Sequence, residues 1–328
     1  MDREIPSNPP AGVTPTPEPI ASSEAGEARG ERGGEPAHRK PRGRVPVGGV
    51  LIFVVLVVLG ATFVLPFVWQ VTISLSSVTD VDRLTLTGTP PAVPTSDVEV
   101  LGLSMPVPDA YIRVFEQVDF VRYFFNSLFV AGWVTILQMI TCSMAAYAFS
   151  RVKWPGREKV FLLYLATLMV PAVVLMVPNF AIVLGLGMFN DYTGLIIPAA
   201  FSAYGTFLLR QFMLTIPSSL DEAAAIDGAG HWRIFTQVIL PLTRPGLIVL
   251  AIFSYLFSYN SFFWPLILIK DDNLRTLPIG LLAFDSTYGQ DTPAIMAASL
   301  MAMLVPMAVF IVLQKYLVRG IQLGAVKG

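Results

Sequence analysis

The residues whose types and spacing suggest a function lie in a polar stretch, 217–245, between two strongly apolar stretches. Ser219 and Glu222 have the capping-box spacing, which predicts a helix with Ser219 as its N-cap. Three alanines follow as strong helix formers. Gly228 and Gly230 are expected to end this helix, because glycine takes the left-handed C-terminal position at little cost. The stretch is either a simple connector or an element that another macromolecule binds.

A second helix is expected from Trp232 to Leu240, with Pro241 and Pro245 ending it. A helix-turn-helix can bind nucleic acid, but such elements normally carry a basic surface. Here the charges balance: Asp221, Glu222 and Asp227 against Arg210, Arg233 and Arg244. The composition therefore disfavours nucleic acid as the partner.

The rest of the chain indicates a membrane protein. Of its 328 residues, 54% are apolar and only 14% are charged, with a mean hydropathy of +0.64. Ordinary soluble domains carry about 25% charged residues. A helix needs about 20 apolar residues to cross the hydrocarbon layer. Uncharged intervals of 18 to 35 residues predict an all-α protein with six transmembrane helices, at roughly 47–73, 124–149, 160–184, 193–213, 246–268 and 293–316.

The basic residues predict the orientation of these spans. With the N-terminus inside, the inner segments hold 17 of the 22 Lys and Arg residues. The positive-inside rule then places both termini in the cytoplasm. Residues 1–44, which carry few bulky apolar side chains, are expected to be a disordered cytoplasmic tail without a cleavable signal peptide. Residues 45–328 are expected to form the transmembrane domain, with a cytoplasmic loop at 216–245.

Several local features refine this picture. Asp109 to Tyr123 could form a short amphipathic helix on the outer membrane surface. Pro171 and Pro178 fall inside the third span, where proline bends a helix or frees backbone carbonyls. The fifth span carries polar residues between 254 and 261, which either hold helices together or line a pathway.

Missing residue types restrict the chemistry. No Asp, Glu, Lys, Arg or His lies well inside a predicted span, which disfavours an ion-coupled carrier. His38 and His231 are the only histidines, too few for a usual zinc set. Cys142 is the single cysteine and is expected to serve packing. None of the six lysines follows a glycine, so the Gly-Lys step of a phosphate-binding loop is missing. Energy for uphill transport would have to come from another chain.

The polar stretch resembles the signature of permease subunits of bacterial ABC importers. That signature is Glu-Ala-Ala, three residues, Gly, nine residues, an aliphatic residue, one residue and Leu-Pro; it is met by Glu222, Ala223, Ala224, Gly228, Val238, Leu240 and Pro241. Three further features resemble the second membrane subunit of the maltose-permease type: residues 145–149 together with 155–157, residues 260–266, and residues 324–328. The resemblance covers about residues 45–328; the tail and the 80–105 segment depart from the family pattern.

The resemblance implies the type I permease fold in a bacterial plasma membrane. It implies that this chain is not an enzyme and binds no cofactor, with ATP and Mg on a partner subunit. The expected partners are a second permease subunit, an ATP-binding subunit dimer, an extracytoplasmic solute-binding protein and the lipid bilayer. The helix from Ser219 to Asp227 would be the coupling helix. The residues implied in coupling are Glu222, Ala223, Ala224, Asp227, Gly228, Leu240 and Pro241.

The transport function implied is import of a sugar or oligosaccharide by alternating access, with the outer loop 269–291 contacting the binding protein. Hydroxyl-rich ligands favour amide and aromatic partners. The candidates for the substrate pathway are therefore Tyr204, Ser258, Tyr259 and Asn260. A polyol or glycerol phosphate remains an alternative substrate. The alternative function is an ion- or sugar-conducting channel or a secondary carrier without an ATPase partner.

Overall fold

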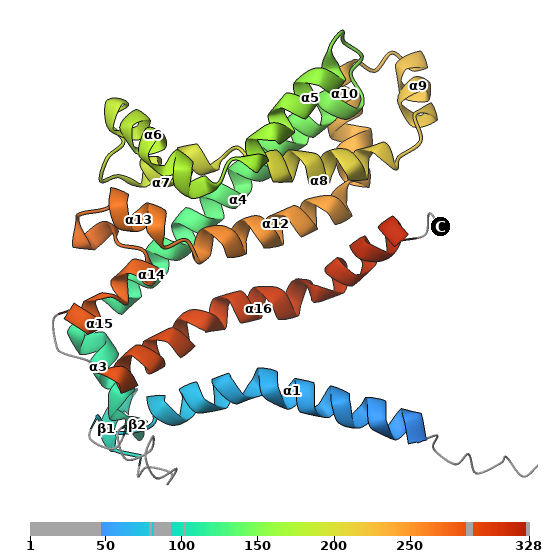
Figure 1. Cartoon of the computed structure of the whole chain (residues 1–328). Helices are drawn as coiled ribbons and strands as arrows, with labels where there is room; N and C mark the ends of the chain where they lie inside the picture. The colour runs from blue at the N-terminus through green and yellow to red at the C-terminus, as the bar shows by residue number, and fades with distance from the viewer. Residues whose placement is uncertain (1–46, 79–80, 82–92, 101–102, 287–290, 326–328) are drawn as a thin grey trace, which may run out of the picture. The chain divides into compact units, whose positions relative to one another are not determined.

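The computed structural model describes residues 47–78, 81, 93–100, 103–286 and 291–325. The chain divides into two compact units, Met1–Val55 and Leu56–Gly328. The expected disordered tail and the closing residues 326–328 lie outside the described residues, as does much of the 80–105 segment. Helix α1, Val47–Ser74, begins in the first unit and continues into the second (Figure 1).

The second unit is built around the long helix α4, Phe120–Ser150. Helices α8 (Ala203–Leu214) and α12 (Arg244–Tyr259) pack along it, and α16 (Thr292–Ala325) packs against α12 (Figure 1). Small and polar residues of α4, including Ala131, Ala146 and Ser143, are buried at these contacts. Such residues let helix backbones approach closely in a membrane protein.

Apolar length agrees with a multi-pass protein. Four described helical segments are long and apolar enough to cross a membrane: Leu51–Ser74, Phe120–Ser150, Tyr192–Leu214 and Thr292–Gln314. Two bent helix pairs raise the number to six if each pair counts as one span. Large apolar side chains on these helices, such as Leu65 and Phe63 of α1, are exposed in the isolated chain, as expected of lipid- or subunit-facing residues.

The predicted third span is not one straight helix. It consists of α5 (Arg157–Ala166), a 3-10 turn (Thr167–Met169) and α6 (Ala172–Gly185), which meet at 101°. Pro171 stands at the break as the N-cap residue of α6. Because proline has no N–H and disfavours a helical conformation in the preceding residue, the helix cannot continue through it. Pro178, by contrast, lies inside α6.

The fifth predicted span, 246–268, is also interrupted. Helix α12 ends at Tyr259, and α13 covers Phe263–Leu268. The helical segment that precedes α12, His231–Leu242, instead forms the second bent pair with it, at 76°. The outer connection that follows contains a 3-10 turn and two short helices, η3 (Asp272–Leu274), α14 (Leu277–Gly280) and α15 (Ala283–Ser286).

The segment between α1 and α4 contains a β-hairpin that the sequence pattern did not predict. Strands β1 (Thr95–Val100) and β2 (Leu103–Pro108) pair antiparallel, with Thr95 opposite Pro108 and Val100 opposite Leu103. The predicted amphipathic helix at 109–123 is present as α3, Asp109–Gln117, but it ends before Tyr123. Its Ala110 and Val114 are buried in the core.

A partly buried ion pair ties α3 to the start of α16. Arg113 Nε lies 2.7 Å from Asp291 Oδ2, and Gln117 donates to the same oxygen at 3.3 Å. Asp291 Oδ1 also accepts the backbone N–H of Ala294 and so caps α16. Burial raises the pKa of the Asp291 carboxyl, but the hydrogen bonds from Arg113 and Ala294 outweigh it, and the net pKa is lowered. The pair is therefore charged at neutral pH and fixes where α16 begins.

Close backbone packing at Gly280 supplies a test of this architecture. A Cβ on Gly280 would lie 2.8 Å and 2.9 Å from Cε2 and Cγ of Tyr123, whose side chain is buried. Gly280→Ala should therefore lower the unfolding free energy by about 1–3 kcal/mol, measured as a lower melting temperature of the detergent-purified protein. Gly132→Ala is the matched control, because a Cβ there meets nothing within 4 Å and alanine is the better helix former. Equal melting temperatures for the two variants would contradict the packing.

Candidate functional site

The first half of the polar stretch forms helix α9, Ser219–Ile226. The alanines at 223–225 carry this helix as predicted. The predicted capping box is wrong: the N-cap residue is Ser218, whose side chain makes no capping hydrogen bond. Glu222 is exposed and donates only its backbone N–H, to the Ser218 carbonyl at 3.1 Å. Since Ser218 is itself in a helical conformation, it cannot offer the extended cap geometry. The Glu222 carboxylate thus projects from the helix toward solvent.

Gly228 ends α9 as predicted, through a Schellman motif. Its φ of 80° is in the left-handed region. The N–H of Gly228 bonds to the Ala225 carbonyl at 3.0 Å, and the N–H of Ala229 bonds to the Ala224 carbonyl at 2.9 Å. These two bonds satisfy carbonyls at the helix end and reverse the chain sharply. Nothing lies within 4 Å of a Cβ at Gly228, so glycine is required there by backbone conformation rather than by space.

The second helix is longer than predicted, and Pro241 does not end it. It runs from α10 (His231–Ile234) through a π-helical turn (Phe235–Ile239) to α11 (Leu240–Leu242). A widened turn accommodates a residue that lacks an N–H, which is why the helix passes Pro241. Pro245 lies in the first turn of α12, where proline is tolerated. The 76° bend therefore falls at Thr243, between the two helices.

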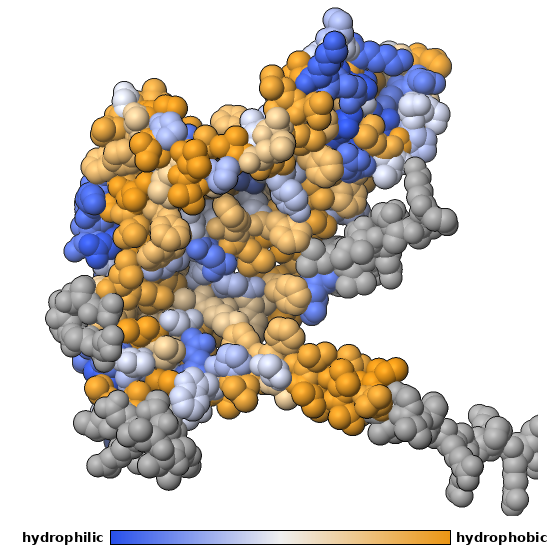
Figure 2. All heavy atoms as spheres, in the orientation of Figure 1, coloured by the Kyte–Doolittle hydropathy of each residue, from blue (hydrophilic) through white to orange (hydrophobic). Residues whose placement is uncertain are grey.

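The helix after the turn has a buried side, whereas α9 has no buried residue. Ile234, Phe235 and Ile239 join a core cluster with α4 and α8, and Ala224 and Leu240 pack against it. Large apolar side chains of both helices are exposed, among them Ile226 of α9 at 87% and Trp232 of α10 at 66%. Figure 2 shows hydrophilic side chains gathered around α9 and the loop before α5, beside hydrophobic surface on α5. An exposed apolar patch rimmed by charge is typical of a protein–protein contact.

Arg151, at the end of α4, holds α9 in place. Its Nη1 lies 2.9 Å from Asp221 Oδ2, and its Nη2 donates to the carbonyls of Ile216, at 2.7 Å, and of Met213. The side chains of Arg151 and Asp221 are only 8% and 21% exposed. A buried guanidinium with three acceptors fixes the geometry of all three. Arg151 thereby joins α4, the end of α8 and the first turn of α9.

Tyr147, one turn earlier on α4, contacts the helix after the turn. Its hydroxyl lies 3.2 Å from Nδ1 of His231, and its ring packs 5.1 Å from that of Phe235. Together Tyr147 and Arg151 connect α4 with both halves of the polar stretch. Neither side chain is marked in the sequence as a contact to the polar stretch, because the burial of Arg151 depends on tertiary contacts that spacing does not encode. The available signals were the position of Tyr147 in the 145–149 motif and of Arg151 among the basic residues between α4 and α5.

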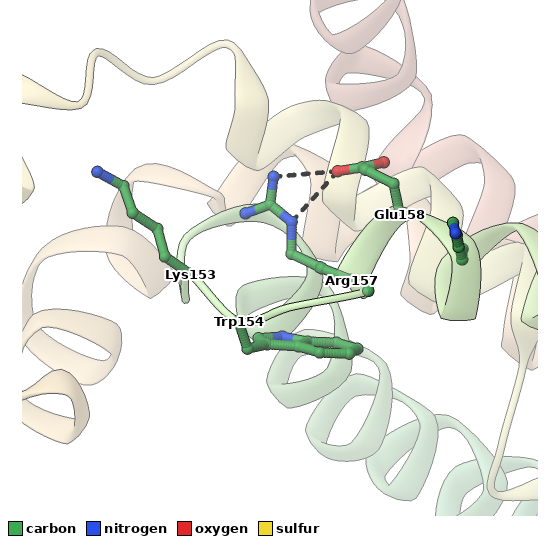
Figure 3. Close-up of a pocket in the computed structure, with 6 residues that line it drawn as sticks. Lys153, Trp154, Arg157 and Glu158 are labelled. Carbon is green, nitrogen blue, oxygen red and sulfur yellow. Dashed lines mark hydrogen bonds and ion pairs between the residues drawn. The ribbon is translucent and has the colours of Figure 1, made fainter.

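A second ionic network lies beside Arg151. Arg210 of α8 donates twice to Glu158, at 2.8 Å and 2.9 Å, and its Nε donates to the Phe149 carbonyl. Its guanidinium also lies 4.2 Å from the centre of the Phe161 ring. Arg157 binds the same Glu158 carboxylate at 3.0 Å (Figure 3). This network joins the end of α4, the start of α5 and the second half of α8.

The four pathway candidates differ in exposure and in the partners that they contact. Tyr204 of α8 is 46% exposed and packs edge-to-face on Phe253. Asn260 is exposed, and its amide donates to the Leu256 carbonyl. Ser258 is partly buried. Tyr259 is only 3% exposed and donates to the Ala302 carbonyl at 3.0 Å. In this conformation Tyr259 therefore joins α12 to α16 instead of facing an open space.

At the other end of α4, polar side chains hold the connection after α13. Asn126 donates to the carbonyls of Asn273 and Arg275 and accepts from the Tyr192 hydroxyl at 2.7 Å. The side chain of Asn190, which has a φ of 56°, accepts the N–H groups of Lys270 and Asp271. The predicted outer loop therefore has a defined shape over 269–277. Within the described ranges, no three His, Cys, Asp or Glu side chains form a group that could hold a metal ion.

Comparison with known proteins agrees with this arrangement. Residues 138–323 match the family described as the binding-protein-dependent transport system inner membrane component. The arabinooligosaccharides transport system permease protein AraQ of Bacillus subtilis is 33% identical over 243 residues, covering 72% of this chain and 86% of the relative. The sn-glycerol-3-phosphate transport system permease protein UgpE of Yersinia enterocolitica is 35% identical over 199 residues, covering 60% of this chain and 71% of the relative.

A solved structure shares the fold. A chain of a bacterial ABC transporter involved in the import of the acidic polysaccharide alginate superposes with a TM-score of 0.68 and 23% identity, covering 83% of this chain and 97% of that one. The mostly helical architecture is thus that of type I ABC importer permeases. The matched residues contain α9, the turn at Gly228 and the helix beyond it. This chain belongs to the binding-protein-dependent transport system inner membrane component family, the membrane permeases of ABC transporters.

Proposed function

We propose that this chain is one of two permease subunits of an ATP-driven importer and carries a sugar or oligosaccharide into the cytoplasm by alternating access. ATP and Mg would bind on a separate subunit pair, whose closure moves α9 and the matching helix of the second permease together. The observation that carries the proposal is the exposed side of α9, held by the buried Arg151–Asp221 pair. Helix α9 is anchored on one side by this ion pair and is exposed on the other, so a push on its exposed side can be transmitted to α4, α8 and α12.

The residues of α9 fit the contact that this function needs. Glu222 and Ala223 are exposed, so a charge-assisted hydrogen bond and a close approach of the two surfaces are both possible there. Asp227 and Gly228 make the turn, and Leu240 and Pro241 lie in the helix that leads to α12. The route from the contact to the transmembrane helices is therefore continuous.

The substrate class rests on the relatives and on the spans. The relatives' names include an arabinooligosaccharide and a glycerol phosphate permease. Charge-free spans favour a neutral, hydroxyl-rich molecule over a phosphorylated one. The substrate would arrive from an extracytoplasmic solute-binding protein that contacts the connection at 269–277.

Co-purification of the tagged chain with an ATPase and a second permease tests the assembly. A chain that transports without an ATPase would instead be a channel or a secondary carrier.

Glu222→Lys should uncouple transport from ATP hydrolysis. Reversal of an exposed charge leaves folding intact but places a cation at the subunit contact. We expect substrate-stimulated ATP hydrolysis by the reconstituted complex to fall at least about tenfold, a loss of about 1.4 kcal/mol. Glu116→Lys, an exposed acid on α3, is the matched control and should hydrolyse ATP normally. Gly228→Val should act like Glu222→Lys through strain at positive φ, whereas Gly228→Asn should be tolerated. Normal coupling in Glu222→Lys would exclude the docking role.

Arg151 and Asp221 should behave as one unit in a double-mutant cycle. Removing either partner leaves a partly buried charge uncompensated, so Arg151→Ala and Asp221→Ala should each lower the amount of substrate moved per ATP hydrolysed. The double variant should be little worse than either single one, with a coupling free energy of about 0.5–3 kcal/mol. Arg233→Ala, an exposed arginine that contacts Gln237, is the control. Strictly additive losses would show that the pair does not position α9.

Substitutions at Asn260 and at Tyr259 should have different effects, the first on substrate uptake and the second on thermal stability. Asn260→Ala should raise the KM for uptake without changing the melting temperature, because the amide is exposed. Tyr259→Phe should lower the melting temperature, corresponding to about 1 kcal/mol for the lost hydrogen bond to Ala302. Uptake assays in vesicles and thermal melts separate the two effects. Unchanged uptake in Asn260→Ala would remove it from the substrate pathway.

A further inference from the structure

The loop between α4 and α5 forms a shallow recess of about 420 Å³. Its lining is unusually basic for so short a segment: Lys153, Trp154, Gly156, Arg157, Glu158 and Lys159. In Figure 3 the side chains of Lys153, Arg157 and Glu158 extend to one side of the loop, and the indole of Trp154 lies along the other.

Some of the basic residues of the recess have an ion-pair partner and others have none among the described residues. Glu158 is bound by both Arg157 and Arg210, so its negative charge is already compensated. Lys153 and Lys159 are exposed, and in the described part of the chain no carboxylate lies within ion-pair distance of either ammonium. The recess therefore carries a positive surplus that attracts an anion. An ammonium acts as a point charge that suits a phosphate group.

The surface beside the recess is apolar. Helix α5 begins at its edge, and the side chains that follow Lys159 are exposed: Val160 at 45%, Leu162 at 69% and Leu163 at 73%. Trp154 stands at this boundary, with its indole Nε1 3.4 Å from the Ala148 carbonyl. Tryptophan is enriched where the headgroup region of a membrane meets the hydrocarbon layer. A soluble anion would interact with the two lysines but would leave Leu162 and Leu163 exposed to water.

We propose that this recess binds one anionic phospholipid. Lys153 and Lys159 supply the positive charge that attracts the headgroup phosphate to the recess, and an acyl chain lies along Leu162 and Leu163. The charge surplus and the adjoining apolar face together select a lipid over a free phosphate. The bound lipid would cover the start of α5 beside the network of Glu158, Arg157 and Arg210.

The test compares lipid retention by the whole transporter complex. The complex is purified from an equal mixture of phosphatidylcholine and phosphatidylglycerol, and bound lipids are counted by native mass spectrometry. The wild type should keep one more phosphatidylglycerol per copy of this chain than the Lys153→Ala/Lys159→Ala variant. Each lysine near an anionic membrane surface contributes about fivefold in affinity, so the single variants should be intermediate. Arg122→Ala, an exposed basic residue at the other end of α4, should match the wild type.

Three results would overturn the proposal. Equal retention of phosphatidylglycerol by wild type and double variant would show that the recess holds no lipid. Displacement of the lipid by added inorganic phosphate would identify a free-anion site. Loss of the ATPase subunit from the double variant, without loss of lipid, would assign the lysines to a protein contact. Because both lysines are exposed, a matching melting temperature shows that the variant is folded.

Discussion

The buried guanidinium of Arg151 is the constraint on which the arrangement of the polar stretch depends. A charge removed from water needs several partners at once, and here they come from Asp221 and from the carbonyls of Met213 and Ile216. Those partners belong to three consecutive pieces of the chain, which must converge on the end of α4. A short helix with no buried residue of its own is thereby given a fixed place. The helix after Gly228 is held separately, because its buried residues pack into a hydrophobic cluster with α4, α8 and α12.

A buried polar side chain also fixes a loop at the opposite end of α4. At its far end Asn126 satisfies two backbone carbonyls and a tyrosine hydroxyl, and it fixes the connection at 273–275. Buried polar side chains near the two ends of α4 thus define the geometry of the loops at both ends. The apolar contacts between α4, α8 and α12 provide the bulk of the packing but specify loop geometry less sharply. For this protein, polar anchors and apolar packing have separate roles.

Much of the fold could be predicted from the sequence because membrane spans are encoded in composition. The apolar stretches, the helix of alanines and the turn at Gly228 all follow from local chemistry. The failures have physical causes. The predicted capping box at Ser219 does not form, because Ser218 is already in a helical conformation. The helix continues past Pro241 because the π-helical turn before it accommodates a residue without an N–H. The hairpin at 95–108 was missed because its strands carry prolines and acids that argue against pairing. Arg151 and the burial of Tyr259 depend on long-range contacts, which residue spacing does not reveal.

The break at Pro171 has a consequence for how the chain enters the membrane. The segments on its two sides, Arg157–Met169 and Ala172–Gly185, are each about 20 Å long. The hydrocarbon layer is about 30 Å thick. Neither segment is long enough to cross this layer alone, so a crossing at this point needs both of them. Helix α4 precedes them in the chain, is long enough to cross unaided and contacts α5, so it can support the first of the two segments.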